Sequence, residues 1–357
     1  MNILYICFID FNNINSGNAL RPYKMYEAFT NLGHNVLLLA TNQDRSNKQN
    51  RKKEIEQIIL QIEKFNPDIC YYESPTLPIK YNYDYKLIKI IKSKNIPCAY
   101  FYRDFYFSFK NIVIYKSLKD YIHSIYMKIL KVKTERILSI FDIVYFPSKE
   151  CFRYFKYKDM RVLPPAASPK NEYNFVNNNT AIYVGGLARR YGTDILEKTF
   201  ENLNKSREYK LIIVCREDDY QNYEHLSKHK YIEIVHASGK DLKAYYDKSS
   251  VALLPLEKNA YNNLAVAIKT FEYMSYGKPI LATSNLATKN IIDECRCGIC
   301  CDDNSEQFEI NLKKMFNDLD ILRYYSKNAY NAIQNNHNWE ARAEQVCREL
   351  MAVKNAK

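Results

Sequence analysis

The 357-residue sequence lacks several features that would assign it to a simple class. No apolar run approaches the ~20 residues that a membrane-spanning helix needs. The first residues, Met1–Cys7, lack the basic head and the small-residue cleavage site of a secretory signal. Glycine occurs only eight times, and a composition that is 47% hydrophobic and 26% charged is not typical of a disordered chain. We therefore expect a folded cytoplasmic protein without a membrane span, long enough for two domains.

The ten cysteines do not form a disulfide framework at this chain length. Cys7, Cys70, Cys98 and Cys215 stand within apolar, strand-like runs, where a thiol behaves as a small buried hydrophobe. The run Cys295–Cys301 superficially resembles a thiolate metal site. A zinc site usually takes its ligands from two separated pairs, however, and this run overlaps a predicted short strand. We therefore expect no metal.

The net charge of +12 is concentrated in the first half of the chain, which includes Lys48, Arg51, Lys52 and Lys53. Residues 112–140 add lysines to apolar residues spaced three and four apart, a pattern typical of an amphipathic helix. Such a helix could lie on anionic lipid at the inner membrane face. A core helix with a solvated basic face explains the pattern equally well. Nucleic-acid binding is not expected, because none of its usual modules is present.

Strand-like apolar runs alternate with helical patterns along most of the chain, which indicates an α/β fold. In the first half these runs are Ile3–Phe8, Asn35–Ala40, Asp68–Tyr72, Pro97–Tyr102 and Asp142–Phe146. In the second half they are Ala181–Val184, Lys210–Cys215, Tyr231–His236, Val251–Leu256, Pro279–Thr283 and Gly298–Cys301. We therefore predict two doubly wound, Rossmann-like parallel-sheet domains that face each other across a cleft, with ligands at the carboxyl ends of the strands.

A domain boundary is indicated where the composition changes. Leu163, Pro164 and Pro165 are followed by a polar stretch that ends in three asparagines at 177–179. Paired prolines and polar residues are typical of a linker. The sequence thus predicts a first domain over residues 1–165 and a second over residues 178–337.

Two glycine-containing segments stand between a predicted first strand and first helix, one in each domain. Gly17 does so in the first domain, and Gly185, Gly186 and Gly192 do so in the second. Free backbone N–H groups at a helix N-terminus favour an anion, and Arg189 and Arg190 would add fixed charge in the second segment. We therefore predict that Gly17, Gly186, Arg189 and Arg190 contribute to binding a diphosphate.

A predicted helix after residue 267 carries Lys269 and Glu272 on one face. Near the carboxyl ends of strands, such a carboxylate can accept hydrogen bonds from two ribose hydroxyls and the lysine can reach phosphate oxygens. A surface pair that only screens its own charges is the alternative. Because both residues are expected near the carboxyl ends of strands, we favour the ligand-binding role.

The segment Phe271-Glu272-Tyr273-Met274-Ser275-Tyr276-Gly277-Lys278-Pro279-Ile280 resembles the signature of retaining GT-B glycosyltransferases of the glycosyltransferase family 4 group. More diffuse similarities extend over nearly the whole chain. They include the glycine segment near Gly17, the strand and loop Tyr183–Gly192, the strand Asp142–Ser148 and a closing helix from about residue 338.

This resemblance implies a GT-B fold with an acceptor-binding first domain, a donor-binding second domain, and a helix over residues 338–357 that crosses back to the first. It implies that Glu272 holds the ribose of a nucleotide-sugar donor, and that Arg189, Arg190 and Lys269 neutralise the donor diphosphate. The nucleotide sugar is then a co-substrate, and no separate cofactor and no obligatory metal are implied.

The chain departs from the family pattern at three places. Leu264 stands where the family often has a second glutamate that contacts the donor sugar, and Tyr191 stands where a basic residue is usual. The family's acceptor-domain histidine is replaced by the segment Tyr102–Phe105. Within it, Asp104, next to Arg103, is our candidate for orienting the acceptor. A structural salt bridge to Arg103 or another neighbour is the alternative for Asp104.

The predicted function is transfer of a sugar from a nucleoside-diphosphate sugar to a saccharide or lipid-linked saccharide, with retention, in the synthesis of a cell-envelope polysaccharide or glycoconjugate. Two alternatives stay open. One is a sugar-nucleotide epimerase on the same scaffold, which would need acid–base groups in the cleft. The other is a non-catalytic partner protein, which the departures at Leu264 and Tyr191 would suit. The donor base, sugar, acceptor and oligomeric state are not predicted.

Overall fold

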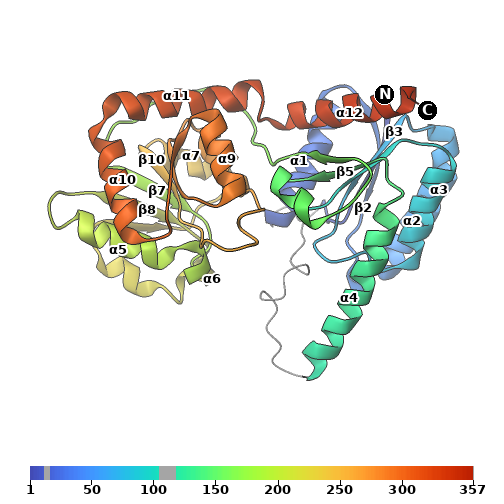
Figure 1. Ribbon diagram of the computed structural model, residues 1–357, viewed down its shortest axis with the longest axis horizontal. Coiled ribbons are helices and arrows are strands. Elements are labelled where there is room, and N and C mark those ends of the chain that lie inside the picture. Colours follow the sequence, from blue (N-terminus) through green and yellow to red (C-terminus); the bar gives the residue numbers. More distant parts are fainter. Residues whose placement is uncertain (12–16, 104–117, 357) are drawn as a thin grey trace. The chain divides into compact units, whose positions relative to one another are not determined.

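The computed structural model describes residues 1–11, 17–103 and 118–356 of the chain (Figure 1). These residues form two compact α/β units. The first unit contains Met1–Pro164 together with Trp339–Lys357, and the second contains Pro165–Asn338. Among the described residues, no helix is both long enough and apolar enough to span a bilayer.

The first unit is built on a six-stranded sheet in the order β2-β1-β3-β4-β5-β6, with every pair of neighbours parallel. Its strands are β1 (Asn2–Cys7), β2 (Asn35–Ala40), β3 (Ile69–Glu73), β4 (Cys98–Phe101), β5 (Ile143–Phe146) and β6 (Met160–Val162). The predicted runs of the first half all form strands. Only β6 was not predicted from the sequence.

Helices connect these strands in the manner of a doubly wound fold. They are α1 (Gly17–Asn31), α2 (Lys48–Phe65), α3 (Asn82–Ser93) and α4 (Leu118–Leu138). The last helix, α12 (Trp339–Asn355), belongs to the same unit but connects no strands. Helix α12 packs against α1, β3 and β4, although it is separated from them by the whole second unit in the sequence. Its buried residues include Trp339, Val346 and Leu350. The basic helix predicted over residues 112–140 corresponds to α4, and its first residues lie outside the described part of the chain.

The second unit has its own six-stranded parallel sheet, in the order β12-β11-β10-β7-β8-β9. The strands are β7 (Thr180–Val184), β8 (Lys210–Val214), β9 (Ile232–Val235), β10 (Val251–Leu254), β11 (Ile280–Thr283) and β12 (Gly298–Cys301). The main helices are α5 (Thr193–Leu203), α6 (Glu217–Tyr220), α7 (Leu242–Tyr246), α8 (Ile268–Ser275), α9 (Leu286–Cys295), α10 (Ser305–Asn317) and α11 (Leu319–Asn335). Two Rossmann-like parallel-sheet units are thus present, as predicted.

The two faces of the second sheet are covered by separate hydrophobic clusters. In β7, Ala181 and Tyr183 belong to the cluster that includes α5 and α10, whereas Ile182 and Val184 belong to the one that includes α8 and α9. Successive side chains of a strand point to opposite faces, so a sheet buried on both sides needs a nearly continuous apolar run. This requirement explains why the strands were predictable.

Both sheets have a topological switch point, where successive connections leave a strand in opposite directions. In the second unit it lies between β7 and β10, and in the first between β1 and β3. Loops on either side of such a point diverge, which leaves a crevice at the carboxyl ends of the strands where ligands bind in open α/β sheets. The candidate site of the second unit is therefore expected at the ends of β7 and β10.

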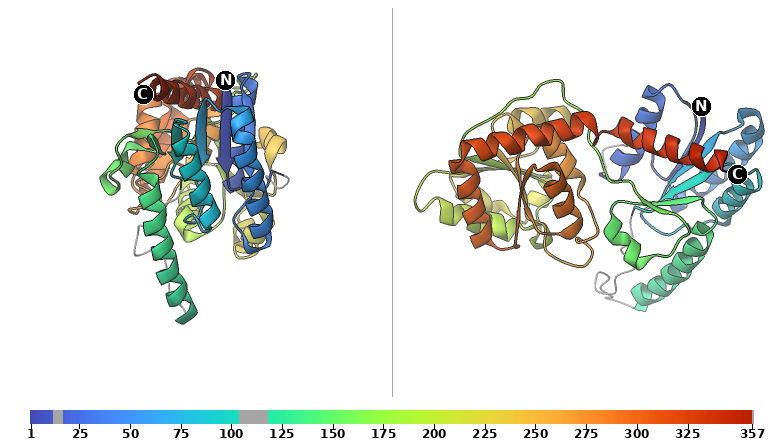
Figure 2. Two further views of the ribbon diagram at one scale, coloured as in Figure 1. Left: turned by 90° about the vertical axis from the view of Figure 1, so that its right-hand side faces the viewer. Right: turned by 45° about the horizontal axis from the view of Figure 1, so that its top comes forward.

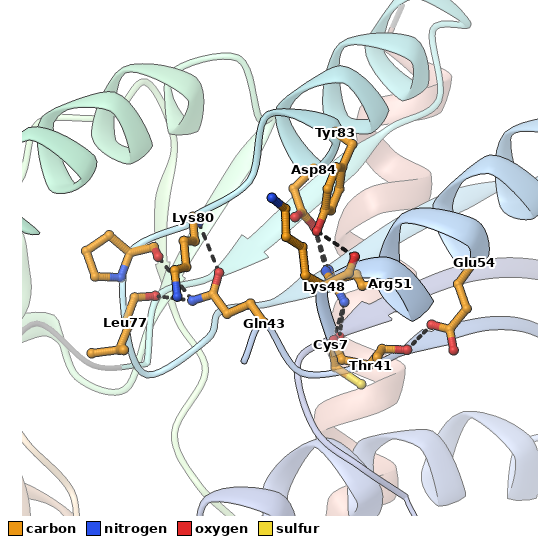
Figure 3. A network of polar contacts seen from close by, with 11 residues as sticks. Cys7, Thr41, Gln43, Lys48, Arg51, Glu54, Leu77, Lys80, Tyr83 and Asp84 are labelled. Carbon is orange, nitrogen blue, oxygen red and sulfur yellow. Dashed lines mark hydrogen bonds and ion pairs between the residues drawn. The ribbon is translucent and has the colours of Figure 1, made fainter. Parts of the chain in front are cut away.

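A buried polar network joins strand ends to helices in the first unit (Figure 3). The Arg51 Nη2 atom lies 2.7 Å from Asp84 Oδ1, and both side chains are fully buried. Arg51 also donates to the carbonyl oxygens of Cys7 and Thr41, which lie at the ends of β1 and β2. Burial raises the pKa of Asp84, and the neighbouring guanidinium partly counteracts that rise. One arginine of α2 thus holds two strand ends and α3 together.

Candidate functional site

Three segments of the second unit meet at the ends of β7 and β10. The Tyr273 hydroxyl of α8 accepts a hydrogen bond from the Val184 N–H at 2.9 Å and lies 3.3 Å from the Leu253 carbonyl oxygen, to which it donates. The backbone N–H of Glu257, after β10, donates to the Arg190 carbonyl oxygen at 3.1 Å. The loop after β7, the loop after β10 and helix α8 are therefore held together at the switch point.

The loop between β7 and α5 depends on glycine. Gly192 has a φ of +77°, and a Cβ atom there would lie 2.0 Å from the Pro255 carbonyl oxygen. The Thr193 hydroxyl bonds both the N–H and the carbonyl group of Ala188, which closes the loop. A side chain at Gly186 would press on the Tyr191 ring at 3.0 Å. The loop is compact, and its backbone lies close to neighbouring groups at both ends.

Both arginines of this loop are exposed on the short helical turn Arg189–Tyr191. Arg190 Nη2 lies 3.1 Å from the Tyr191 hydroxyl, and the guanidinium is 4.7 Å from the centre of that ring. A guanidinium over the face of an aromatic ring is attracted by that ring, which favours one position of the side chain. The two side chains therefore provide fixed positive charge beside the loop.

Lys269 and Glu272 form an ion pair on α8, with Lys269 Nζ 2.7 Å from Glu272 Oε2. The other carboxylate oxygen accepts a hydrogen bond from the Tyr246 hydroxyl at 2.7 Å. The Glu272 side chain is 20% exposed and that of Lys269 is 33% exposed, so both remain accessible to a ligand. Each carboxylate oxygen has a further lone pair, so Glu272 is oriented and can still accept hydrogen bonds.

The tyrosines that support this pair were not identified from the sequence. Burial, and then the nearby Glu272 carboxylate, raise the pKa of Tyr246 well above its usual value, so its hydroxyl stays protonated and donates. Tyr246 also stacks on Tyr276, with ring centres 4.1 Å apart. Tyr246 and Tyr273 are both fully buried, and they fix α8 to α7 and to the ends of β7 and β10. Tyr273 and Tyr276 lie within the signature segment, whereas Tyr246 lies 26 residues before Glu272, where no local pattern marks it.

Lys278, within the signature, is structural. Its side chain is 1% exposed, and its ammonium group donates to the Ser249 carbonyl oxygen at 2.9 Å. Desolvation lowers its pKa to about 8. The lysine therefore connects the start of β11 to the segment before β10 and does not face a ligand.

A pH-dependent stability is expected from Lys278. Because its pKa in the folded state lies below the unfolded value, the folded state disfavours the charged form, and stability rises as pH increases from about 8 toward 10.5. Between pH 7 and 9.5 we expect a gain on the order of 1–2 kcal/mol. Denaturation of the wild type and of Lys278→Met at both pH values tests this, since the variant should lack that part of the gain. Equal gains in both proteins would contradict it.

The remaining predicted site residues lie in the first unit. Gly17 begins α1, and Arg103 follows β4. The Arg103 N–H donates to Ser74 Oγ at 3.0 Å, and its Nη2 atom donates to Thr76 Oγ1 at 3.2 Å. Asp104 lies outside the described residues. The structure thus brings Lys269 and Glu272 together, and it keeps Gly186, Arg189 and Arg190 on one loop.

The two departures from the family pattern have structural counterparts. Leu264 is fully buried, so this position contributes to packing in this chain. Tyr191 supports Arg190, as described above. The structure thus accounts for what both residues do in the fold.

The cysteine-rich segment does not assemble a ligand set. Across the described ranges, no cluster of three or more histidine, cysteine, aspartate or glutamate side chains could hold a metal ion. All ten cysteines are free thiols. Cys295 Sγ lies 3.5 Å from His337 Nε2, and Cys297 is fully buried beside it. Cys295 is the last residue of α9, so its contact with His337 lies at the end of that helix.

The sequence comparisons found one family model and one curated relative. The sequence model described as "Glycosyl transferases group 1" matches residues 178–318, which lie within the second unit and make up most of it. A curated relative from Haemophilus influenzae, named "Uncharacterized glycosyltransferase", is 27% identical over 164 residues. That match covers 44% of this chain and 43% of the relative, so less than half of each protein is compared.

Solved structures resemble the chain over nearly its full length. WaaG, a glycosyltransferase involved in lipopolysaccharide biosynthesis, matches with a TM-score of 0.59 at 13% identity, over 96% of this chain and 98% of its own. Anabaena Alr3699/HepE in complex with UDP matches with a TM-score of 0.62 at 11% identity, over 99% and 100%. The structure of S. aureus MnaA with UDP matches with a TM-score of 0.54 at 11% identity, over 99% of this chain and 97% of its own. At such low identity these likenesses establish the fold alone.

The two parallel-sheet units, the similar solved structures and the family-model match over the second unit are consistent with one another. The chain has the GT-B fold, and its residues 178–318 match the sequence model of the glycosyl transferases group 1 family.

Proposed function

We propose that this chain is a glycosyltransferase that moves a sugar from a nucleoside-diphosphate sugar to a saccharide or lipid-linked saccharide. The observation that carries the proposal is the Lys269–Glu272–Tyr246 arrangement at the switch point, next to the glycine loop with its two exposed arginines. The family match over residues 178–318 supports a transferase over an epimerase or a non-catalytic partner. UDP bound to the similar Alr3699/HepE structure is consistent with a nucleotide ligand.

In this proposal Glu272 accepts hydrogen bonds from the ribose hydroxyls, while Tyr246 keeps the carboxylate in place. Arg189, Arg190, Lys269 and the N–H groups near Gly186 face the diphosphate. Cleavage of the anomeric bond leaves negative charge on that diphosphate, and preorganised cations stabilise it without any reorganisation in the transition state. The cationic side chains supply charge that a divalent metal supplies elsewhere, so we propose that no metal is obligatory.

We further propose that the reaction retains the anomeric configuration, with the leaving phosphate accepting the proton of the attacking hydroxyl. The acceptor would be bound by the first unit, with Arg103 and Asp104 as the candidates for orienting it. We propose that the enzyme works in the cytoplasm and that its acceptor is held at the inner membrane face. Its product would belong to a cell-envelope polysaccharide or glycoconjugate.

The donor site is tested by thermal stability with UDP, GDP, ADP, TDP and CMP in turn. A ligand at about 100 times its dissociation constant stabilises a protein by about 2.7 kcal/mol. We expect one nucleoside diphosphate to stabilise the wild type and to lose most of that effect with Glu272→Ala, because the ribose then loses its acceptor. Transfer of sugar from the matching nucleotide sugar should fall with it.

Glu309→Ala is the matched control for this experiment. Glu309 on α10 is 21% exposed and pairs with Lys313 Nζ at 2.7 Å, almost the same burial and geometry as Glu272 with Lys269. Its loss should leave the nucleotide response intact. If no nucleoside diphosphate stabilised the wild type at millimolar concentration, the donor site would be refuted and the non-catalytic partner favoured.

A further inference from the structure

A groove with a volume of about 700 Å³ runs between α3 and α4 of the first unit. That volume lies within the range of about 300–1,000 Å³ typical of small-molecule sites. Its apolar lining comes from Ile125, Ile129, Val132 and Ile137 of α4, with the Tyr85 ring of α3 opposite them. The groove belongs entirely to the first unit and takes no part in the nucleotide site described above.

Helix α4 carries two apolar faces, which is unusual for a helix that covers a sheet. Met127, Leu130 and Leu138 are buried and account for its packing in the unit. A second row is exposed to solvent: Ile122 is 60% exposed, Ile125 43%, Ile129 62% and Val132 46%, with Tyr126 at 43%. Figures 1 and 2 show that the helix also extends beyond the sheet of its own unit. A contiguous exposed apolar row of this kind marks an interaction surface.

The charged side chains that line the groove are all of one sign. Lys89, Lys128, Lys133 and Arg136 line the groove, and none of its lining residues is a carboxylate. Lys133 donates to the Asn82 side-chain oxygen at 2.6 Å and lies 4.3 Å from the centre of the Tyr85 ring, so its partners among the described residues are neutral. Four cations next to an apolar floor fit a ligand with an anionic head and a hydrocarbon body.

A lipid bilayer matches this pattern better than other large anions. Nucleic acid would leave the isoleucine row in water, because its accessible surface is mainly phosphate and sugar. In a membrane-surface helix, by contrast, apolar residues enter the boundary between head groups and acyl chains, while lysines and arginines meet anionic lipid phosphates. The spacing of Ile122, Ile125, Ile129 and Val132 along one face of α4 has this arrangement.

We propose that the α3–α4 groove and the exposed face of α4 form a binding site for anionic phospholipid. The exposed row enters the acyl region, part of one acyl chain occupies the groove, and Lys89, Lys128, Lys133 and Arg136 contact the phosphates. This inference rests on the proposed function where it places the acceptor at a membrane, and it adds the residues and the lipid class. Lipid binding needs no nucleotide, so the two can be tested separately.

Flotation with vesicles of pure phosphatidylcholine, and of phosphatidylcholine mixed with phosphatidylglycerol, tests the proposal with the full-length chain. We expect binding to the mixed vesicles only. Each cation near an anionic surface contributes roughly fivefold to the partition. Lys128→Gln with Lys133→Gln should therefore weaken binding about 25-fold. Ile125→Ser with Ile129→Ser should also release the protein at low salt, where charge alone would still hold it.

Helix α2 offers matched controls on the same unit. Leu60 is 80% exposed and Lys52 is 60% exposed, so Leu60→Ser and Lys52→Gln make the same kinds of change away from the groove. They should bind as the wild type does. Equal binding to both vesicle types, or none, would overturn the proposal. Unchanged vesicle binding of the Ile125→Ser, Ile129→Ser variant would also overturn the proposal, because the contact with lipid would then be purely electrostatic.

The nucleotide panel separates this inference from the proposed function. The isoleucine and lysine variants should keep the wild-type response to the nucleoside diphosphate, because they lie in the other unit. A protein that responds to nucleotide and ignores anionic vesicles would retain its proposed function and refute the lipid site. A protein that binds anionic vesicles but no nucleotide would retain the lipid site and refute the proposed function.

Discussion

Replacing Arg51 with methionine is expected to lower the free energy of unfolding of the first unit by about 3–5 kcal/mol. The change leaves the fully buried carboxylate of Asp84 without its counter-charge (Figure 3). It also removes the donor to the Cys7 and Thr41 carbonyl oxygens, and the guanidinium packed 3.8 Å from the centre of the Phe8 ring. Chemical denaturation of the full chain measures the loss, and hydrogen exchange of peptides from residues 1–164 assigns it to this unit.

The exposed neighbour Lys52 provides the control on the same helix. Its side chain is 60% exposed and its ammonium group lies 3.7 Å from Glu56, so Lys52→Met should cost no more than about 0.5 kcal/mol. The loss in Arg51→Met should also shrink as pH falls. Burial raises the pKa of Asp84 and only Arg51 opposes that rise, so the variant can neutralise the carboxylate in mild acid. A loss as small as that of Lys52→Met would show that the buried pair contributes little.

Replacing Gly192 with alanine is expected to destabilise the second unit by about 2–5 kcal/mol and to abolish the nucleotide response. The positive φ of +77° costs an alanine about 1–2 kcal/mol. The added Cβ would lie 2.0 Å from the Pro255 carbonyl oxygen, and relieving that contact adds about 1–3 kcal/mol. The backbone must then move at the junction of the β7 and β10 loops, where the diphosphate is proposed to bind.

Gly239→Ala separates the backbone strain from the steric contact. Gly239 lies in the same unit with a φ of +59°, and a Cβ atom there meets nothing within 4 Å. This variant should show only the strain, about 1–2 kcal/mol, and should bind nucleotide normally. Denaturation and thermal shift of the two variants side by side provide the comparison. Similar stabilities for both would mean that the contact with Pro255 is easily relieved.

The central strands were predictable from the sequence because they are buried on both faces of their sheets, so their apolar runs are continuous. The exception is β6, Met160–Val162, whose three residues are only half-buried and leave no such run. The overall class followed from the alternation of strands and helices. The site pair Lys269 and Glu272 was found because its two residues lie one helical turn apart.

Contacts between distant residues were not predictable. Tyr246 lies 26 residues before Glu272, and Tyr273 lies 89 residues after Val184, so no local pattern shows either hydrogen bond. Arg51 looked like one of several surface charges on a basic segment, yet it is fully buried against Asp84. Lys278 likewise belongs to the signature but faces Ser249. Charge in a sequence indicates solvent exposure only when no partner comes from another element.

The discontinuous first unit sets an order of events during protein synthesis. Domains usually fold as they emerge, the N-terminal one first. Here α12 packs on α1, β3 and β4, and Trp339 places its ring 5.9 Å from the buried Arg21 guanidinium. The second unit, Pro165–Asn338, is continuous and leaves the ribosome before α12 does. The first unit must therefore wait, with one side uncovered, until the second has been made.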